Sequence, residues 1–83
     1  MVKLVYSAVE ENGENDDVGK YVTYGICGKL VEIDTGKCIE SEMVHDVSTK
    51  RRLVEKWAAL FEMHQLSLIH FREAVEDRIV MEA

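Results

Sequence analysis

The sequence predicts a small α+β domain, in which a three-stranded antiparallel meander is followed by two helices packed on one face of the sheet. Apolar residues recur with a period near two from Val2 to Val47, and with helical spacing from Leu53 to Val80. These are the periods of strands and of amphipathic helices. The period changes at residues 46–49, Asp-Val-Ser-Thr, which is a helix-start signal. Strands followed by helices are typical of α+β folds.

The first two strands are expected at residues 2–9 and 21–33. Both carry apolar side chains on both faces, which is typical of a strand that is central or meets a partner chain. Residues 10–19 connect the two strands, and half of the side chains in this segment are acidic. Because hairpin connections usually have about two to five residues, we expect a mobile acidic loop here. Gly25 and Gly28 favour a β-bulge nearby.

The connection to the third strand has a clear turn signal. Asp-Thr-Gly at residues 34–36 predicts a three-residue hairpin loop, with Gly36 in the left-handed conformation. The third strand is then expected over residues 37–47. In this register the following residues face each other: Val31 and Ile39, Cys27 and Met43, and Glu32 and Cys38. The two cysteines are then about 17 Å apart, at roughly 3.4 Å per residue, which is beyond disulfide reach.

Two helices follow, at residues 49–64 and from Ser67 onward. Ser48 or Asp46 is expected to cap the first helix, and Ser67 the second. Leu66 and Phe71 have the spacing of a hydrophobic staple around Ser67. The expected buried stripes are Leu53, Val54, Trp57, Leu60, Phe61 and His64 in the first helix, and Leu68, Phe71, Val75 and Ile79 in the second. Imperfect alternation in the strands leaves open which face of the sheet the helices cover.

Composition excludes several classes of function. Residues 1–83 form one domain, and 16 acidic against 10 basic residues give a net charge of −6. A nucleic-acid partner is not expected, because binding to phosphates depends on Lys and Arg. No apolar run approaches the roughly 20 residues of a membrane span, and the first residues do not resemble a signal peptide. We therefore expect a cytoplasmic protein with two reduced cysteines.

One arrangement has the residue types of a metal site. His70, Glu73 and Asp77 are spaced i, i+3 and i+7, which places them on one helical face, and imidazole with carboxylates could hold a transition metal. The alternative is an ordinary solvated helix face. His70 also lies in the first turn of the second helix, where its ring could bond back to the cap region.

Other chemical patterns are weaker. A cysteine nucleophile needs a positioned base, and neither cysteine has a local signature for one. The acidic residues of segment 10–19 lack the spacing of an EF-hand. Two helices joined by a short turn suggest a helix-turn-helix, but the second helix is acidic rather than basic. We therefore expect a protein that is not an enzyme and has no cofactor.

Three short segments resemble a family of small, uncharacterised proteins of anaerobic, spore-forming Gram-positive bacteria, classified as a domain of unknown function. They are Tyr24-Gly25-Ile26, residues 46–49, and Ser67-Leu68-Ile69-His70-Phe71 with Val75-Glu76-Asp77. Family members often have Pro where this chain has Leu68. The resemblance implies a cytoplasmic, single-domain bacterial protein and no activity. If the last segment is functional, the candidate interaction residues are Ile69, His70, Glu76 and Asp77.

The leading functional hypothesis is a non-enzymatic interaction or regulatory module. It would act through a protein partner or a second copy of itself, because an outer strand of a three-stranded sheet can pair with another chain. A two-fold homodimer is the simplest form of self-association. The alternative is a small metal- or ligand-binding protein that uses His70, Glu73 and Asp77.

Overall fold

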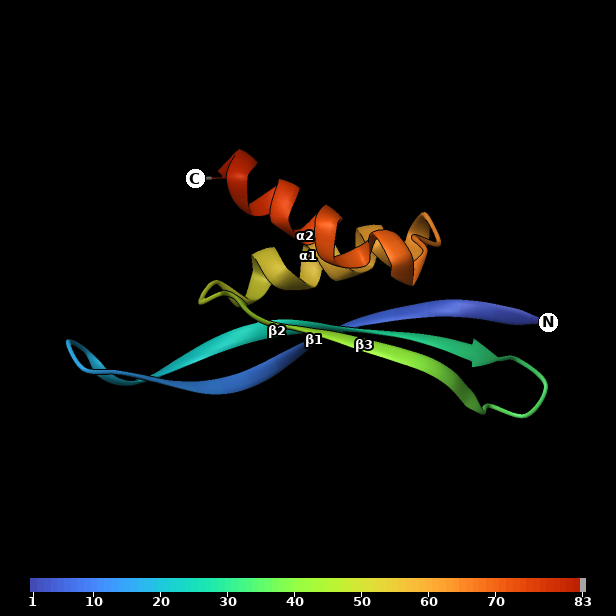
Figure 1. Ribbon diagram of the computed structural model, residues 1–83, viewed down its shortest axis with the longest axis horizontal. Helices are drawn as coiled ribbons and strands as arrows, with labels where there is room; N and C mark the ends of the chain where they lie inside the picture. The colour runs from blue at the N-terminus through green and yellow to red at the C-terminus, as the bar shows by residue number, and fades with distance from the viewer. Residues whose placement is uncertain (83) are drawn as a thin grey trace.

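A computed structural model describes residues 1–82, which form a three-stranded antiparallel sheet followed by two helices. The sheet has the order β1-β2-β3. Its elements are β1 (Val2–Asn15), β2 (Gly19–Glu32), β3 (Cys38–Ser48), α1 (Arg51–Met63) and α2 (Leu68–Glu82). Both helices lie on the same side of the sheet (Figure 1). The predicted fold class, including the placement of the helices, is therefore confirmed.

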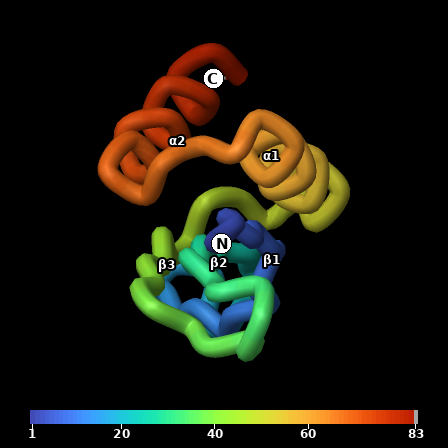
Figure 2. The backbone as a smooth tube through the Cα atoms, turned by 90° about the vertical axis from the view of Figure 1, so that its right-hand side faces the viewer, coloured from blue at the N-terminus to red at the C-terminus, as the bar shows by residue number. Residues whose placement is uncertain are grey.

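The two helices lie side by side above different strands. Figure 2 shows α1 on the β1 side of the sheet and α2 on the β3 side. Between helices and sheet is one core, whose buried hydrophobic residues are Tyr6, Ile26, Val44, Val47, Val54, Trp57, Ala58, Phe61, Leu68, Phe71 and Val75. The helical periodicity of the sequence thus identifies most of the buried face of both helices. The prediction is wrong for His64, which is exposed, and it missed Ala58, which is buried.

Three aromatic rings join the layers at the centre of this core. Tyr6 of β1 contacts Phe61 of α1 and Phe71 of α2 edge to face, with ring centroids 5.7 and 5.0 Å apart. The Tyr6 hydroxyl donates a hydrogen bond to the carbonyl oxygen of Leu66, between the helices. Burial, with a smaller effect from the carboxylate of Glu42, raises the pKa of Tyr6 to about 12. The hydroxyl therefore remains a donor across the physiological pH range.

The first hairpin is longer than the sequence suggests. β1 continues to Asn15 and β2 begins at Gly19, so most of segment 10–19 is paired strand, and the expectation of a loop there is wrong. A turn over residues 16–18 closes the hairpin, and the side chain of Asn15 accepts a hydrogen bond from the Asp17 N–H at 2.7 Å. Polar side chains are compatible with this extension because it projects beyond the helices (Figure 1). That its tip is mobile stays a prediction.

The second hairpin confirms part of the predicted register. Cys27 faces Met43 as expected, and Gly36 is left-handed, with φ +74°. However, Val31 faces Cys38, and the register shifts between Leu30 and Val31. The predicted Val31–Ile39 and Glu32–Cys38 pairs are therefore wrong.

The reason lies in the turn, which holds four residues instead of three. The Glu32 N–H donates to the Lys37 carbonyl at 2.9 Å, and the Gly36 N–H donates back to the Glu32 carbonyl at 2.8 Å. The extra turn residue shifts the pairing of β3 with β2 by one residue next to the turn, so that Val31 faces Cys38. The bulge near Leu30 then restores the predicted register, in which Leu30 faces Glu40. Both cysteines are free.

The two helices begin differently. α1 starts after Lys50, which makes no side-chain capping bond, so neither Ser48 nor Asp46 is its cap. The Ser48 hydroxyl instead accepts the Lys50 N–H at 3.1 Å within the preceding turn. Ser67 does cap α2, because its hydroxyl accepts the Ile69 N–H at 3.4 Å.

The C-terminal half of α2 is less buried than predicted. Leu68, Phe71 and Val75 are buried, but Ile79 is 40% exposed. Figure 1 shows α2 rising away from the sheet toward its C-terminal end. The helical spacing of Ile79 is correct, but its side chain lines an open hollow, which it shares with Val47 and Trp57, and is therefore only partly covered.

Truncating the central ring of the core should unfold much of the protein. Phe71 is fully buried, and Phe→Ala substitutions in cores remove about 3–5 kcal/mol of stability. We expect the free energy of unfolding of Phe71→Ala, measured by urea denaturation, to fall by this amount. The control Val80→Ala, at a position that is 74% exposed, should change stability by less than about 0.5 kcal/mol. Equal losses in the two variants would contradict this description of the core.

Candidate functional site

The four candidate residues predicted from the sequence, Ile69, His70, Glu76 and Asp77, all lie on the exposed surface of α2. Ile69 and Glu76 share one stripe of the helix and His70 and Asp77 the next, because residues seven apart align. Ile69 is 86% exposed. The His70 backbone N–H donates to the Ser67 carbonyl at 3.0 Å, so the contact with the cap comes from the main chain instead of the ring. The helix therefore brings the residues together in pairs but does not converge them on one point.

Two of the candidate residues border hollows. Ile69 lines one of about 140 Å³ with Leu4, Leu30 and Glu40. Asp77 lines a groove of about 270 Å³ between the helices, together with Leu60, Phe61, His64, Leu66, Ala74 and Arg78. Pockets for small molecules are usually roughly 300–1,000 Å³ and deeply concave. This groove is smaller, and its shape does not favour a small-molecule site.

The alternative metal site is not preassembled. Across residues 1–82, no three His, Cys, Asp or Glu side chains are gathered in a way that could hold a metal ion. This finding includes His70, Glu73 and Asp77, and also the acidic residues of the first hairpin. Sharing a helical face does not make their ligand atoms converge.

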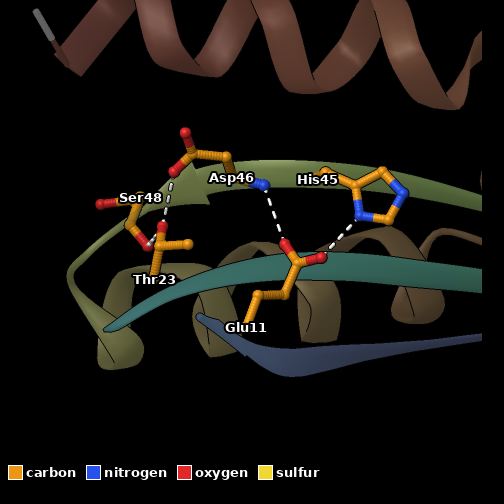
Figure 3. Close-up of polar contacts among 5 residues, drawn as sticks. All are labelled: Glu11, Thr23, His45, Asp46 and Ser48. Carbon is orange, nitrogen blue, oxygen red and sulfur yellow. Dashed lines mark hydrogen bonds and ion pairs between the residues drawn. The ribbon is translucent and has the colours of Figure 1, made fainter. Parts of the chain in front are cut away.

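A polar cluster that was not predicted from the sequence lies on the face of the sheet that the helices do not cover. Its residues are drawn in Figure 3. Side chains alternate between the two faces along a strand. Because Tyr6 and Ala8 of β1 point toward the helices, Glu11 points to the other face of the sheet. One carboxylate oxygen of Glu11 accepts the Asp46 N–H at 2.9 Å, and the other lies 2.5 Å from His45 Nδ1. Glu11 thus links β1 to β3 across the middle strand.

The middle strand allows this link because it has Gly25 at the crossing point. A Cβ atom on Gly25 would lie 2.7 Å from the Glu11 carboxylate and 2.6 Å from the backbone oxygen of Val44. Gly25 also marks an irregularity, since residues 45–47 of β3 stand opposite this single residue of β2. The bulge predicted near Gly25 is therefore confirmed, and its extra residues belong to β3.

Asp46 forms the apex of that bulge in the left-handed conformation, with φ +50°. Asp adopts this conformation more readily than most residues. Its carboxylate accepts a hydrogen bond from the hydroxyl of Thr23 at 2.7 Å, and Thr23 is only 3% exposed. Glu11, Thr23, His45 and Asp46 each make at least one hydrogen bond to another strand, which is the arrangement of a structural support.

The charge of Glu11 is part of that support. Burial raises the pKa of its carboxyl, but the hydrogen bonds from His45 and from the Asp46 N–H together outweigh burial. The pKa of Glu11 therefore lies below its ordinary value, and the folded protein favours the ionised carboxylate.

A different arrangement is found along the outer edge of β1, the side that faces away from β2. The Leu4 N–H donates to the side-chain oxygen of Gln65 at 2.8 Å, and the Gln65 amide donates back to the Leu4 carbonyl at 2.9 Å. The Tyr6 N–H donates to a carboxylate oxygen of Glu62 at 3.0 Å. Side chains at the end of α1 thus replace a neighbouring strand over this part of the edge.

Beyond Tyr6 the same edge is open. The register of β1 with β2 is uninterrupted from Val2 to Asn15, and peptide groups in an antiparallel strand point alternately to its two sides. The groups of Ala8, Glu10 and Asn12 therefore point outward, as those of Leu4 and Tyr6 do. In the described part of the chain, no hydrogen bond covers them.

A groove runs beside this open stretch, between β1 and α1. It consists of two adjoining hollows of about 230 and 370 Å³, both of which are lined by Ala8 and Glu55. Their remaining lining residues are Tyr6, Ser7, Glu10, Tyr24, Arg51, Ala58, Ala59 and Glu62. Small side chains on both elements leave the strand edge accessible from the helix side. The pair Ala58-Ala59 was the available sequence signal, but in a helical pattern it is indistinguishable from ordinary helix residues.

Comparison with known proteins places the chain in a family. Residues 1–81 match the family of unknown function DUF6514. The chain belongs to this family. This confirms the resemblance to a domain of unknown function. No match was found among curated proteins or among solved structures.

Neither helix of this DUF6514 chain, within residues 1–82, is long and apolar enough to cross a membrane.

The Glu11 carboxylate should make stability depend on pH in acid. Because its pKa is lowered on folding, its contribution is complete above the ordinary value of 4.5 and is lost as pH falls through the folded pKa. Glu11→Gln keeps an acceptor for the Asp46 N–H but removes the charge. We expect the variant to be less stable by about 1 kcal/mol at neutral pH, with the two unfolding curves converging in acid. A pH-independent difference would contradict the assignment.

Proline substitutions should distinguish the two sides of β1. The Ala8 N–H points outward, so Ala8→Pro should change the free energy of unfolding by less than about 1 kcal/mol. The Val9 N–H points toward β2, so Val9→Pro removes a ladder bond and should destabilise the fold by more than about 1 kcal/mol. Urea denaturation of both variants measures this. The reverse order would show that the edge assignment is wrong.

Proposed function

We propose that this DUF6514 protein is a non-enzymatic protein–protein interaction module, which receives an extended segment of a partner as a fourth strand beside β1. The observation that carries the proposal is that the outer edge of β1 is covered at one end and open further along. Leu4 and Tyr6 are covered by side chains of the protein itself, whereas the outward groups from Ala8 to Asn12 are open, and Ala8 and Glu10 adjoin a groove. Unpaired strand edges are sites at which another chain can pair.

Main-chain hydrogen bonds would supply much of the binding energy. Each contributes a net of about 0.5–1.5 kcal/mol, and three outward-facing residues offer a donor and an acceptor each. The small side chains of Ala8 and Ala59 leave the side chains of an added strand space against α1. The groove thus provides the depth that a bare sheet edge lacks.

The other outer strand is less suited to pairing. β3 has irregular register at two places, beside Leu30 and opposite Gly25. Bulges of this kind disturb the regular spacing of peptide groups, and they are one of the ways in which proteins protect strand edges. β1 is regular along its whole length, which favours it as the binding edge.

A second copy of the chain is an alternative occupant of the same edge. Two copies related by a two-fold axis could pair β1 with β1. That arrangement would place the two acidic grooves next to each other, since Glu10, Glu55 and Glu62 line each of them. Like charges brought together oppose association, so we favour a different chain as the partner.

We also propose, on the resemblance of segments 46–49 and 67–71, that the protein comes from a spore-forming Gram-positive bacterium. We further propose that it works in the cytoplasm, for which the two free thiols give support.

The test compares partner binding by the wild-type protein and by Ala8→Pro in lysate of the source organism. The tag belongs at the C-terminus, because the Met1 carbonyl accepts a hydrogen bond from Ile33. We expect species bound by the wild type to be lost from Ala8→Pro, whose ring occupies the edge while the fold is kept. Val80→Ala is the matched control and should bind as the wild type does.

Native mass spectrometry of the recovered complexes separates the possible partners. A heavier complex that contains a second protein, and that Ala8→Pro does not form, supports strand addition by a partner. A doubled mass that Ala8→Pro abolishes identifies self-association at the same edge. Identical complexes from the wild type and Ala8→Pro would refute β1 as the binding edge.

A further inference from the structure

We infer that the segment received beside β1 is basic, with Lys or Arg at alternate positions facing α1. The inference rests on the proposed function, since it names the chemistry of the partner at that same edge. It depends on the charges that border the groove and on the alternation of side chains in an added strand.

The groove has an excess of negative charge. Glu10 projects from β1, while Glu55 and Glu62 project from α1. Arg51 is the one basic residue among those lining the groove, and it pairs with Glu55 at 3.3 Å. Both partners of that pair are more than half exposed, and exposed pairs of this kind contribute little to stability. An incoming cation can therefore compete for Glu55.

Geometry determines which side chains of the partner meet these carboxylates. Neighbouring residues in paired strands project to the same face. Residues of the added strand opposite Ala8 and Glu10 therefore project toward α1, and every second residue of that strand follows them. These are the positions where a basic side chain would meet Glu10, Glu55 and Glu62.

The walls of the groove also suit Lys and Arg by shape. Ala8 and Ala59 offer a narrow apolar surface, along which the methylene stem of a long basic side chain can lie while its charged end reaches the carboxylates. A large apolar side chain would fill the same space but would leave the carboxylates without a counter-charge. The net charge of −6 adds long-range attraction for a basic segment.

The test uses short synthetic strands as defined probes. Three peptides of equal length are compared: alternating Lys and Val, alternating Glu and Val, and the Lys–Val peptide with a central Pro. A fourth peptide copies residues 5–13 of β1. Binding to the full chain is measured by fluorescence anisotropy, and the binding site is located from the amide NMR shifts of Ala8, Glu10 and Asn12.

The key variant removes charge from the groove alone. Glu10→Gln combined with Glu55→Gln should weaken binding of the Lys–Val peptide roughly fivefold or more. The matched control is Glu73→Gln combined with Glu76→Gln on α2, which changes the net charge equally on the β3 side and should weaken binding less than about twofold. Glu62 is left unchanged because it holds the Tyr6 N–H.

The expected result is binding of the Lys–Val peptide with shifts at the three outward amides, and loss of that binding with the Pro-containing peptide or with Ala8→Pro. Equal or tighter binding of the Glu–Val peptide would overturn the basic inference while leaving strand addition intact. Undiminished binding of the Lys–Val peptide by the Glu10→Gln, Glu55→Gln variant would also overturn the basic inference. Preferential binding of the β1 peptide would identify a second copy as the occupant. Absence of binding by any peptide, with Ala8→Pro keeping all cellular partners, would overturn both proposals.

Discussion

The contact on which the rest of the structure depends is the packing of Tyr6 between the two helices. Its ring contacts Phe61 and Phe71 edge to face, and its hydroxyl binds the carbonyl of Leu66 in the connection between α1 and α2. One side chain of an outer strand thus positions the end of α1 and the start of α2 together. Because Glu62 and Gln65 lie in this region, the same contact places them against the edge of β1. Packing in the core therefore determines which part of the edge is covered.

Much of the fold could be predicted from the sequence because its signals were local. The two hydrophobic periods identify three strands and two helices, Gly36 marks a turn, and Ser67 marks the start of α2. The errors have physical reasons outside local pattern. Polar residues of segment 10–19 are compatible with a solvated ribbon as well as with a loop. A fourth turn residue shifted the second hairpin, and Ile79 has helical spacing but borders an open hollow where α2 rises away from the sheet.

The candidate sites were less predictable because they depend on contacts between distant residues. Glu11 and Asp46 meet only once the register of three strands is known, and Gly25 is the single local sign of their contact. The groove beside β1 arises from Ala8, Ala58 and Ala59, which are unremarkable in sequence. By contrast, the candidate residues on α2 lie on exposed stripes of the helix, but a shared stripe does not make their side chains converge. Sequence pattern indicates which face a residue occupies, whereas a site also requires the depth and convergence that tertiary packing creates.

The paired hydrogen bonds between Gln65 and Leu4 have a consequence for the length of any sheet that this protein can join. An added strand that runs along β1 past Ala8 meets Glu62 and then the Gln65 amide, which already occupies the next donor and acceptor. The amide therefore blocks an added strand from extending or sliding in that direction. A fully open edge would permit many registers and continued addition of strands. An edge closed at one end removes all the registers that would run past that end.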